Sequence, residues 1–235
     1  AGEEGLSRPA RVGACDQATG WGCRVTAGPV PVKPMRLGDS AALEAGSDVI
    51  VAGFGGGTRA IRARVVSRRV FAGYWEYLLP DAIFTQPPYR LFGGAALVDK
   101  DGKLVGIGSL IVGDAIEPGN ASPGNMFVPI NALKPILAQL IANGRSDGPR
   151  HPWIGVYTDD VRERVFVNRL APGGPGDKAG VAPGDIVVAI AGKPVTGQID
   201  FYHKLWALGG PGMTVAMTVL RKSGTLEVLM SDSGH

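Results

Sequence analysis

The chain has no long apolar run, and this absence limits the kinds of protein it can be. No stretch of roughly 18 apolar residues occurs, so the sequence predicts no membrane-spanning helix. The first residues, Ala1 to Gly5, lack the basic segment and the following apolar segment of a secretory signal peptide. We therefore expect that export does not occur or that it depends on residues outside this sequence.

Histidine and cysteine are both scarce. The three histidines, His151, His203 and His235, all follow residue 150. The two cysteines, Cys15 and Cys23, lie eight positions apart in a glycine-rich region with no histidine nearby, which excludes a zinc site built from them. A disulfide between them is favoured in an oxidising compartment, and two free thiols are expected otherwise. The sequence predicts no metal site and no cofactor.

The composition is that of a folded, β-rich protein. Apolar residues make up 45% of the chain and charged residues 19%, which excludes a disordered chain. The 36 glycines and 18 prolines favour many turns, and hence strands rather than a helical bundle. A length of 235 residues suits one large domain or two ordinary ones.

The charge pattern gives no support to a nucleic-acid partner. The net charge is only +3, and most basic residues are scattered. One arginine cluster could bind phosphate, but its alternation is explained more simply by the solvated face of a strand, which we favour: Arg59, Arg62, Arg64, Arg68 and Arg69.

A glycine-rich hairpin stands near the middle of the chain. The bend at Leu91 to Gly94 leads into a short apolar strand, 95–98, then a tight Asp-Lys-Asp-Gly turn, and then a second strand from Leu104. Two apolar strands joined by such a turn predict an antiparallel hairpin.

This stretch resembles the nucleophile region of the HtrA/DegP family of trypsin-like serine proteases, where Gly-Asn-Ser-Gly-Gly-small-Leu-Val precedes a hairpin. Leu97 and Val98 match the Leu-Val pair, and the serine position falls on Gly93. Glycine has no side-chain oxygen that could attack a carbonyl. Since every histidine lies downstream, a triad built here would also lack its imidazole base. We predict no catalytic residue and no hydrolysis by the serine route.

The resemblance places the oxyanion-hole N–H groups at Leu91 and Gly93. Leu91 stands where the family has a glycine with an unusual backbone angle, so one hypothesis is that this loop is held in an unformed state. The other interpretation, which we favour, is an ordinary packed turn.

The resemblance extends over residues 1–147, which we expect to form a partial trypsin-like β-barrel, mostly the second barrel of the family, followed by a helix. The first barrel, which carries the family's histidine and aspartate, is expected to be largely absent, and residues 1–30 are expected to be mostly turns around one short extended piece, 24–26. Predicted strands are 49–52, 61–67, 82–86, 104–112 and 125–129. The helix is predicted to begin with Asn131 as its cap, to end at Asn143-Gly144, and to bury a stripe formed by Leu133, Ile136, Leu137, Leu140 and Ile141.

From residue 151 to residue 232 the resemblance is to the α+β PDZ domain that follows the protease in this family. The motifs that carry it are 153–156 (Trp-Ile-Gly-Val), 170–181 and 183–195, with strands at 165–167, 214–220 and 225–230. The predicted fold class is therefore mainly β, with the barrel first and the PDZ domain second.

A PDZ domain holds a polypeptide C-terminus beside a sheet edge, with backbone N–H groups on its carboxylate. In the predicted helix 200–208, one stripe (Phe201, Leu205, Leu208) is assigned to the core and the opposite one to the groove. The expected peptide-binding residues are Trp153, Ile154, Gly155, Val156, Tyr157, Tyr202, His203 and Trp206. For two of these a simpler role is available: His203 as surface decoration and Trp153 as packing at the domain junction.

The sequence thus predicts an inactive HtrA-like protein whose PDZ domain binds protein C-termini or unfolded and extended polypeptides. The alternatives are the C-terminal portion of a serine endopeptidase whose histidine and aspartate lie upstream and whose serine is replaced by Gly93, and a scaffold whose groove between Val156 and Trp206 is blocked. By resemblance, the location is periplasmic or otherwise exported, and family members are often oligomers.

Overall fold

The computed structural model describes residues 9–16, 18–148 and 150–231. Its contacts divide the chain into two units: the first is Ala1–Val70 with Leu79–Asp147, and the second is Phe71–Leu78 with Gly148–His235. The second unit therefore includes a short piece from the first half of the sequence. Predictions that concern Ala1 to Gly5, residue 232 and His235 fall outside the described residues.

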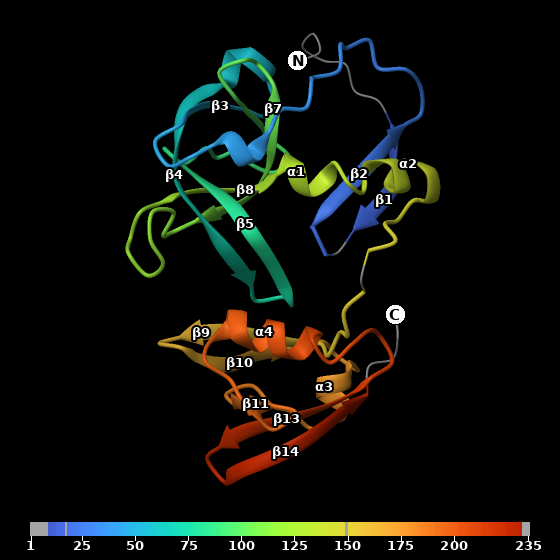
Figure 1. The fold of residues 1–235 in the computed structure, drawn as a ribbon, viewed down its shortest axis with the longest axis vertical. Coiled ribbons are helices and arrows are strands. Elements are labelled where there is room, and N and C mark those ends of the chain that lie inside the picture. The colour runs from blue at the N-terminus through green and yellow to red at the C-terminus, as the bar shows by residue number, and fades with distance from the viewer. Residues whose placement is uncertain (1–8, 17, 149, 232–235) are drawn as a thin grey trace. The chain divides into compact units, whose positions relative to one another are not determined.

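The first unit is built on a closed barrel of six strands (Figure 1). In barrel order these are β3 (Asp48–Ala52), β4 (Ile61–Gly73), β5 (Tyr77–Gln86), β8 (Gly124–Pro129), β7 (Leu104–Val112) and β6 (Ala96–Val98). β6 and β7 form the predicted antiparallel hairpin, with Leu97 opposite Gly106. The side chain of Asp99 stabilises the turn of this hairpin. Its Oδ1 accepts hydrogen bonds from the backbone N–H groups of Asp101 at 2.9 Å and Lys103 at 2.8 Å.

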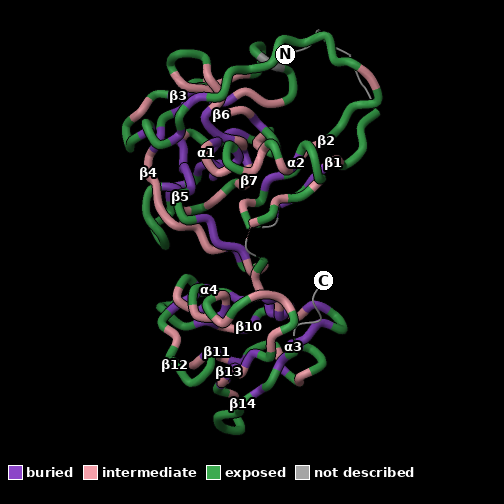
Figure 2. The backbone as a smooth tube through the Cα atoms, turned by 45° about the vertical axis from the view of Figure 1, so that its right-hand side comes forward, coloured by how far each residue is buried: buried purple, intermediate pink, exposed green. Residues whose placement is uncertain are grey.

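Alternation along the strands fills the barrel. In β3, Val49 and Val51 are buried while Ile50 between them is 44% exposed, because successive side chains point to opposite faces of a strand. Figure 2 shows this as buried segments along the barrel strands and exposed turns at their ends. The core consists of Leu43, Val49, Val51, Ala63, Val65, Ile83, Tyr89, Ala95, Leu97, Val105 and Phe127.

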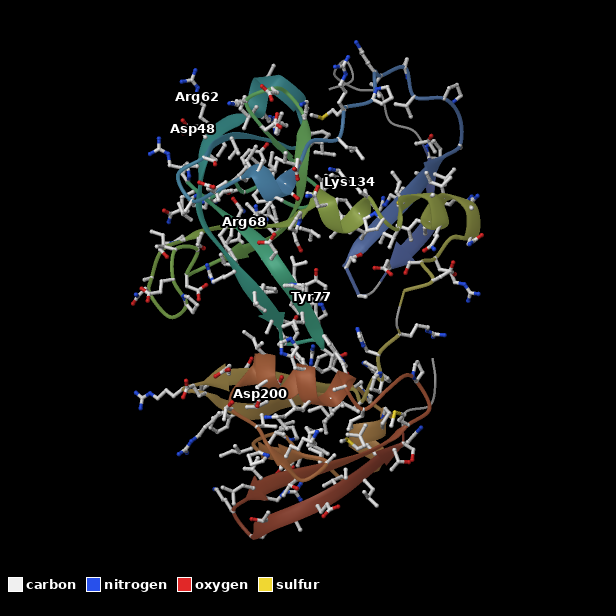
Figure 3. All side chains as sticks on the ribbon, viewed as in Figure 1. Asp48, Arg62, Arg68, Tyr77, Lys134 and Asp200 are labelled. Atoms are coloured by element: carbon white, nitrogen blue, oxygen red, sulfur yellow. The ribbon has the colours of Figure 1, made fainter. Side chains whose placement is uncertain are left out.

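The arginine cluster is only partly a solvated face. Arg64 is exposed and pairs with Asp48 at 3.1 Å, and Asp48 and Arg62 lie on the outside of the barrel in Figure 3. Arg68 is different, because its guanidinium donates to Leu43 O at 2.8 Å and also bonds to Asp81. Arg69 lies 3.7 Å from the Phe84 ring centroid. The prediction of a solvated face was wrong for Arg68 and Arg69, whose side chains are half-buried and contact other residues of the first unit.

Residues before the barrel are more ordered than predicted. Two antiparallel strands, β1 (Ala10–Asp16) and β2 (Trp21–Thr26), form a sheet of their own. The carboxylate of Asp16 accepts from Thr19 N at 2.9 Å and from the hydroxyl of Ser146. Cys15, which is exposed, and Cys23, which is half-buried, are both free thiols in this structure.

The predicted helix is present but interrupted. It consists of α1 (Ile130–Leu133) and α2 (Leu137–Asn143), and α2 ends at Gly144 in a left-handed conformation as predicted. Asn131 does not cap it, because its amide donates instead to Asp39 Oδ1 at 2.6 Å beside the 3-10 helix η1 (Ser40–Ala42). The break shifts the apolar stripe, which leaves Ile141 76% exposed.

The second unit contains a sheet in the order β14-β13-β11-β10-β9, with β12 paired to β11. The strands are β9 (Val156–Val161), β10 (Arg164–Leu170), β11 (Ile186–Ile190), β12 (Lys193–Pro194), β13 (Thr214–Arg221) and β14 (Gly224–Ser231). The helices are α3 (Pro175–Lys178) and α4 (Gln198–Trp206). β9 ends the sheet and pairs with β10 alone among the named strands, so its other edge has backbone groups to satisfy.

An ion pair with one buried partner, Asp185, links the start of β11 to the end of β13. The side chain of Asp185 is only 1% exposed, and Arg221 donates to both of its oxygens at 2.6 Å. Asp185 also accepts from Ala182 N at 2.9 Å. The hydrogen bonds from Arg221 are the main reason why the pKa of Asp185 lies below its usual value.

We expect Asp185→Asn to lower the free energy of unfolding by about 2 kcal/mol near neutral pH, because it removes the charge from a buried carboxylate that accepts hydrogen bonds from Arg221 and from Ala182 N. Since the folded-state pKa is lowered, the stabilisation is present above about pH 4 and is lost as the pH falls through the lowered value, so the variant should lose this part of the acid dependence. Urea unfolding from about pH 3 to pH 7 measures it. Asp101→Asn is the control, because Asp101 forms only an exposed pair with Lys103 at 3.8 Å. Equal losses in both variants would contradict the prediction.

Candidate functional site

The first candidate site is the bend that precedes β6. Ala95 N donates to Phe92 O at 2.9 Å, so residues 92–95 form a turn in which Gly93 and Gly94 are the central residues. Gly94 has a φ of 76°, which favours glycine at this position. Gly94 N is in turn bonded to Gly108 O on β7 at 2.9 Å. The bend is therefore fixed to the barrel wall.

Close packing under the bend also requires glycine. A β-carbon on Gly108 would lie 2.1 Å from Phe92 O, so the bend can approach β7 only because residue 108 has no side chain. At Gly93 the situation is the opposite, because no atom lies within 4 Å of an added β-carbon. The space for a side chain is thus open at the position where the resemblance expects serine, but glycine supplies no hydroxyl.

The segment leading into the bend is held by a buried asparagine. Asn125, on β8, accepts from Tyr89 N at 2.6 Å and donates to Tyr89 O at 3.1 Å. The hydroxyl of Tyr89 accepts from Gly53 N at 3.1 Å. Leu91 follows with 41% of its surface exposed. Whether Leu91 holds the loop in an unformed state or lies in an ordinary packed turn stays a prediction. The assignment of the Leu91 and Gly93 N–H groups to an oxyanion hole stays a prediction as well.

A hollow of about 410 Å³ lies beside this bend in the first unit. The residues that line it include Trp21 and Arg24 of β2, Gly94, and Gly108 and Ser109 of β7. The indole N–H of Trp21 is buried and has no hydrogen-bond partner in the described structure. No histidine occurs in residues 1–70 or 79–147, so the first unit supplies no imidazole to this region.

The second candidate site is the loop that enters β9. Two of its backbone carbonyl groups accept hydrogen bonds from elsewhere in the second unit: Gly176 N donates to Ile154 O at 2.8 Å, and Ala171 N donates to Gly155 O at 2.9 Å. Gly155 has a φ of 68°, and a β-carbon on Gly176 would lie 2.6 Å from Val156 Cγ2. The glycines at both positions therefore allow the loop to adopt this path, which we call the capture loop (residues 153–156).

The N–H groups of the capture loop hold a carboxylate. Ile154 N donates to Glu76 Oε2 at 3.1 Å, and Val156 N donates to Glu76 Oε1 at 3.0 Å. Glu76 belongs to the second unit, in the turn between β4 and β5. Two backbone donors on the two oxygens of one carboxyl group form a charge-assisted anion site.

Tyr202 of α4 completes this arrangement. The side chain is fully buried, and its hydroxyl donates to Gly73 O at 2.7 Å and accepts from Glu76 N at 3.2 Å. Burial raises the pKa of Tyr202 to about 12, and the nearby charge of Glu76 adds to this effect. The phenol is therefore a neutral donor at physiological pH.

The other predicted peptide-binding residues are placed as follows. Trp206 stacks on Tyr202, with ring centroids 5.3 Å apart, and on His151, at 4.5 Å. His203 is exposed on α4. The Trp153 ring lies 3.2 Å from the β-carbon position of Gly155 in the same loop, and both roles suggested for Trp153 stay predictions. Phe201 and Leu205 are buried as expected, and Leu208 is half-buried.

The sequence analysis did not predict that the tip of the β4–β5 hairpin, residues 73–76, contacts the capture loop and β9. We call these four residues the hairpin tip. Gly73, Tyr74 and Glu76 meet the groove residues, and Thr158 N on β9 donates to Tyr74 O at 3.1 Å. Gln198, at the start of α4, supports Thr158 through a bond to Thr158 O at 2.7 Å. A signal existed in the sequence: four aromatic residues fall within positions 71–77, which is unusual for a solvated turn.

Two family models match the chain. A trypsin-like peptidase domain matches residues 1–107, and a PDZ domain matches residues 152–230. Among the described residues, no helix combines the length and apolar character needed to cross a membrane.

Known proteins agree with these matches. The periplasmic pH-dependent serine endoprotease DegQ of Escherichia coli is 30% identical over 148 residues, covering 57% of this chain and 31% of DegQ. A probable periplasmic serine endoprotease DegP-like of Rhizobium meliloti is 30% identical over 196 residues, covering 76% of this chain and 36% of that protein. This chain thus spans about a third of the length of these relatives.

The solved structure of the HtrA-type protease AlgW with decapeptide shares the fold, with a TM-score of 0.57 at 18% identity over 95% of this chain and 71% of that chain. The mainly β architecture predicted from the sequence is thereby confirmed. The chain thus has a trypsin-like peptidase domain followed by a PDZ domain, with HtrA/DegP serine proteases among its homologues.

Proposed function

We propose that this chain captures polypeptide C-termini, or extended polypeptides, in the groove of its PDZ domain and does not itself hydrolyse peptide bonds by the serine route. The observation that carries the capture proposal is the pair of N–H groups of Ile154 and Val156 that hold a carboxyl group at 3.1 and 3.0 Å. A chain terminus presents the same chemical group, and the backbone that precedes it can pair with the edge of β9 that faces away from β10.

The absence of catalysis is argued from the chemistry of the first unit. The nucleophile position holds Gly93, and the unit contains no histidine that could act as a base. The barrel would then serve as a scaffold for the binding domain. Since several relatives are named periplasmic endoproteases, we also propose an exported or periplasmic location.

The second candidate function is that of a portion of an active serine endopeptidase. It is favoured by the match to the trypsin-like peptidase domain and by relatives that are named as endoproteases. It requires a histidine and an aspartate from residues outside this sequence and a serine where Gly93 stands.

We expect a peptide with a hydrophobic C-terminal residue to bind the chain, and we expect amidation of its terminal carboxylate to weaken binding about ten-fold or more. Hydrogen bonds to a charged group contribute about 1.5–3 kcal/mol, and each 1.4 kcal/mol is a factor of ten in affinity. Fluorescence anisotropy with both peptides measures the difference. Acetylation of the peptide N-terminus is the control and should change nothing. Equal affinities for the free acid and the amide would exclude carboxylate capture.

Gly93→Ser should leave the chain unable to hydrolyse casein and unreactive towards a fluorophosphonate label. The added side chain meets no atom within 4 Å at its β-carbon, so the variant is expected to fold. Without an imidazole in the first unit, the new hydroxyl has no base to take its proton. Gly93→Ala is the matched control, with the β-carbon and without the oxygen. Hydrolysis by the serine variant alone would favour the endopeptidase and would show that a base exists elsewhere.

A further inference from the structure

The place where the PDZ resemblance expects a groove, between β9 and Tyr202 of α4, is occupied by residues of the second unit itself. The occupant is the tip of the β4–β5 hairpin, Gly73 to Glu76. Its Glu76 carboxylate lies on the N–H groups of Ile154 and Val156, and its Tyr74 carbonyl accepts from Thr158 N at 3.1 Å.

The register of these contacts is that of an added strand. Val156 is bonded to Glu76, and Thr158 is bonded to Tyr74, so two steps forward along β9 correspond to two steps back along the hairpin tip. The direction of the tip is therefore that of an antiparallel neighbour, with one backbone hydrogen bond, at Thr158, and one contact to a side chain, at Val156. The Glu76 side chain takes the place that a terminal carboxylate would take, two residues after the paired carbonyl.

Contacts from α4 hold the same residues from the other side. The Tyr202 hydroxyl donates to Gly73 O at 2.7 Å and accepts from Glu76 N at 3.2 Å. The Tyr74 ring meets the Tyr157 ring of β9 edge-on, with centroids 6.2 Å apart. The tip is therefore bound along both walls of the groove.

The backbone at Glu76 points to a role for its side chain. Glu76 has a φ of 57°, a left-handed conformation that glycine or asparagine adopts more readily. What glutamate offers there, and glycine does not, is a carboxylate that reaches the capture loop. The aromatic residues around it fix the tip, since Trp75 and Tyr77 stack with centroids 5.6 Å apart and an interplanar angle of 10°. A preorganised segment loses less entropy on binding.

We propose that the hairpin tip is a built-in competing ligand: Glu76 imitates a C-terminal carboxylate in the capture loop, and an external chain terminus binds only when the tip leaves. This rests on the proposed capture function and adds its regulation. The competitor is part of the chain, so its effective concentration does not depend on the protein concentration.

The test measures the affinity of the full chain for a hydrophobic peptide with a free C-terminal carboxylate. Glu76→Gln removes the charge of the competitor, and Glu76→Asn removes it with a residue that accepts the left-handed backbone of the turn. Both variants should bind the peptide about ten-fold more tightly than the unmodified chain. Glu227→Gln is the control, because Glu227 is exposed on β14 of the same unit. A second measurement follows the backbone amide signals of Ile154 and Val156 by NMR, which should move in the Glu76 variants and stay in place in the control.

The outcomes separate the two proposals. Equal peptide affinity in the unmodified chain and both Glu76 variants, with the free acid still preferred over the amide, would overturn the competition and leave capture intact. Binding of neither peptide form to any of the proteins would overturn capture itself, and the competition with it. Tighter binding that also appears in Glu227→Gln would reflect net charge and would contradict the role of Glu76.

Discussion

The structure of the second unit depends on the N–H groups of the capture loop. The loop carbonyls of Ile154 and Gly155 are committed to Gly176 and Ala171, which turns the opposite side of the backbone, with its donors, towards the groove. A buried donor left unpaired costs about 1–3 kcal/mol, so such a loop is stable only with water or an anion in front of it. The glycines at positions 155 and 176 allow the backbone to follow this path. The Glu76 carboxylate, from the same chain, accepts the hydrogen bonds of the N–H groups of Ile154 and Val156.

The first unit shows how packing can fix a bend independently of chemistry. Phe92 O rests against the place where a Gly108 side chain would be, Gly94 is bonded to β7, and Asn125 holds the backbone of Tyr89. These constraints all come from the barrel and would act on any residue at position 93. Packing against the barrel therefore accounts for the path of this bend, and Gly93 adds no side-chain oxygen to it.

Local patterns predicted the strands and motifs, whereas contacts distant in sequence were missed. Alternation identified β3, and the Asp-Lys-Asp-Gly turn identified the β6–β7 hairpin, because both are encoded by neighbouring residues. The cap assigned to Asn131 was wrong because Asp39, ninety-two positions away, takes its side chain. Arg68 followed an exposed pattern but is tied to the backbone of Leu43. Glu76 was not predicted in the groove because nothing near it in sequence indicates its partners at Ile154 and Val156.

The antiparallel register of the hairpin tip has a kinetic consequence. The tip occupies both the carboxylate position and the backbone position two residues before it, so an incoming chain end finds these two positions of the edge taken. Association would then be gated. At low ligand concentration its rate would rise in proportion to concentration, and at high concentration it would level off at the rate at which the tip itself departs. The lifetime of the bonds at Glu76 would thus set the fastest response of this protein, whatever the abundance of its ligand.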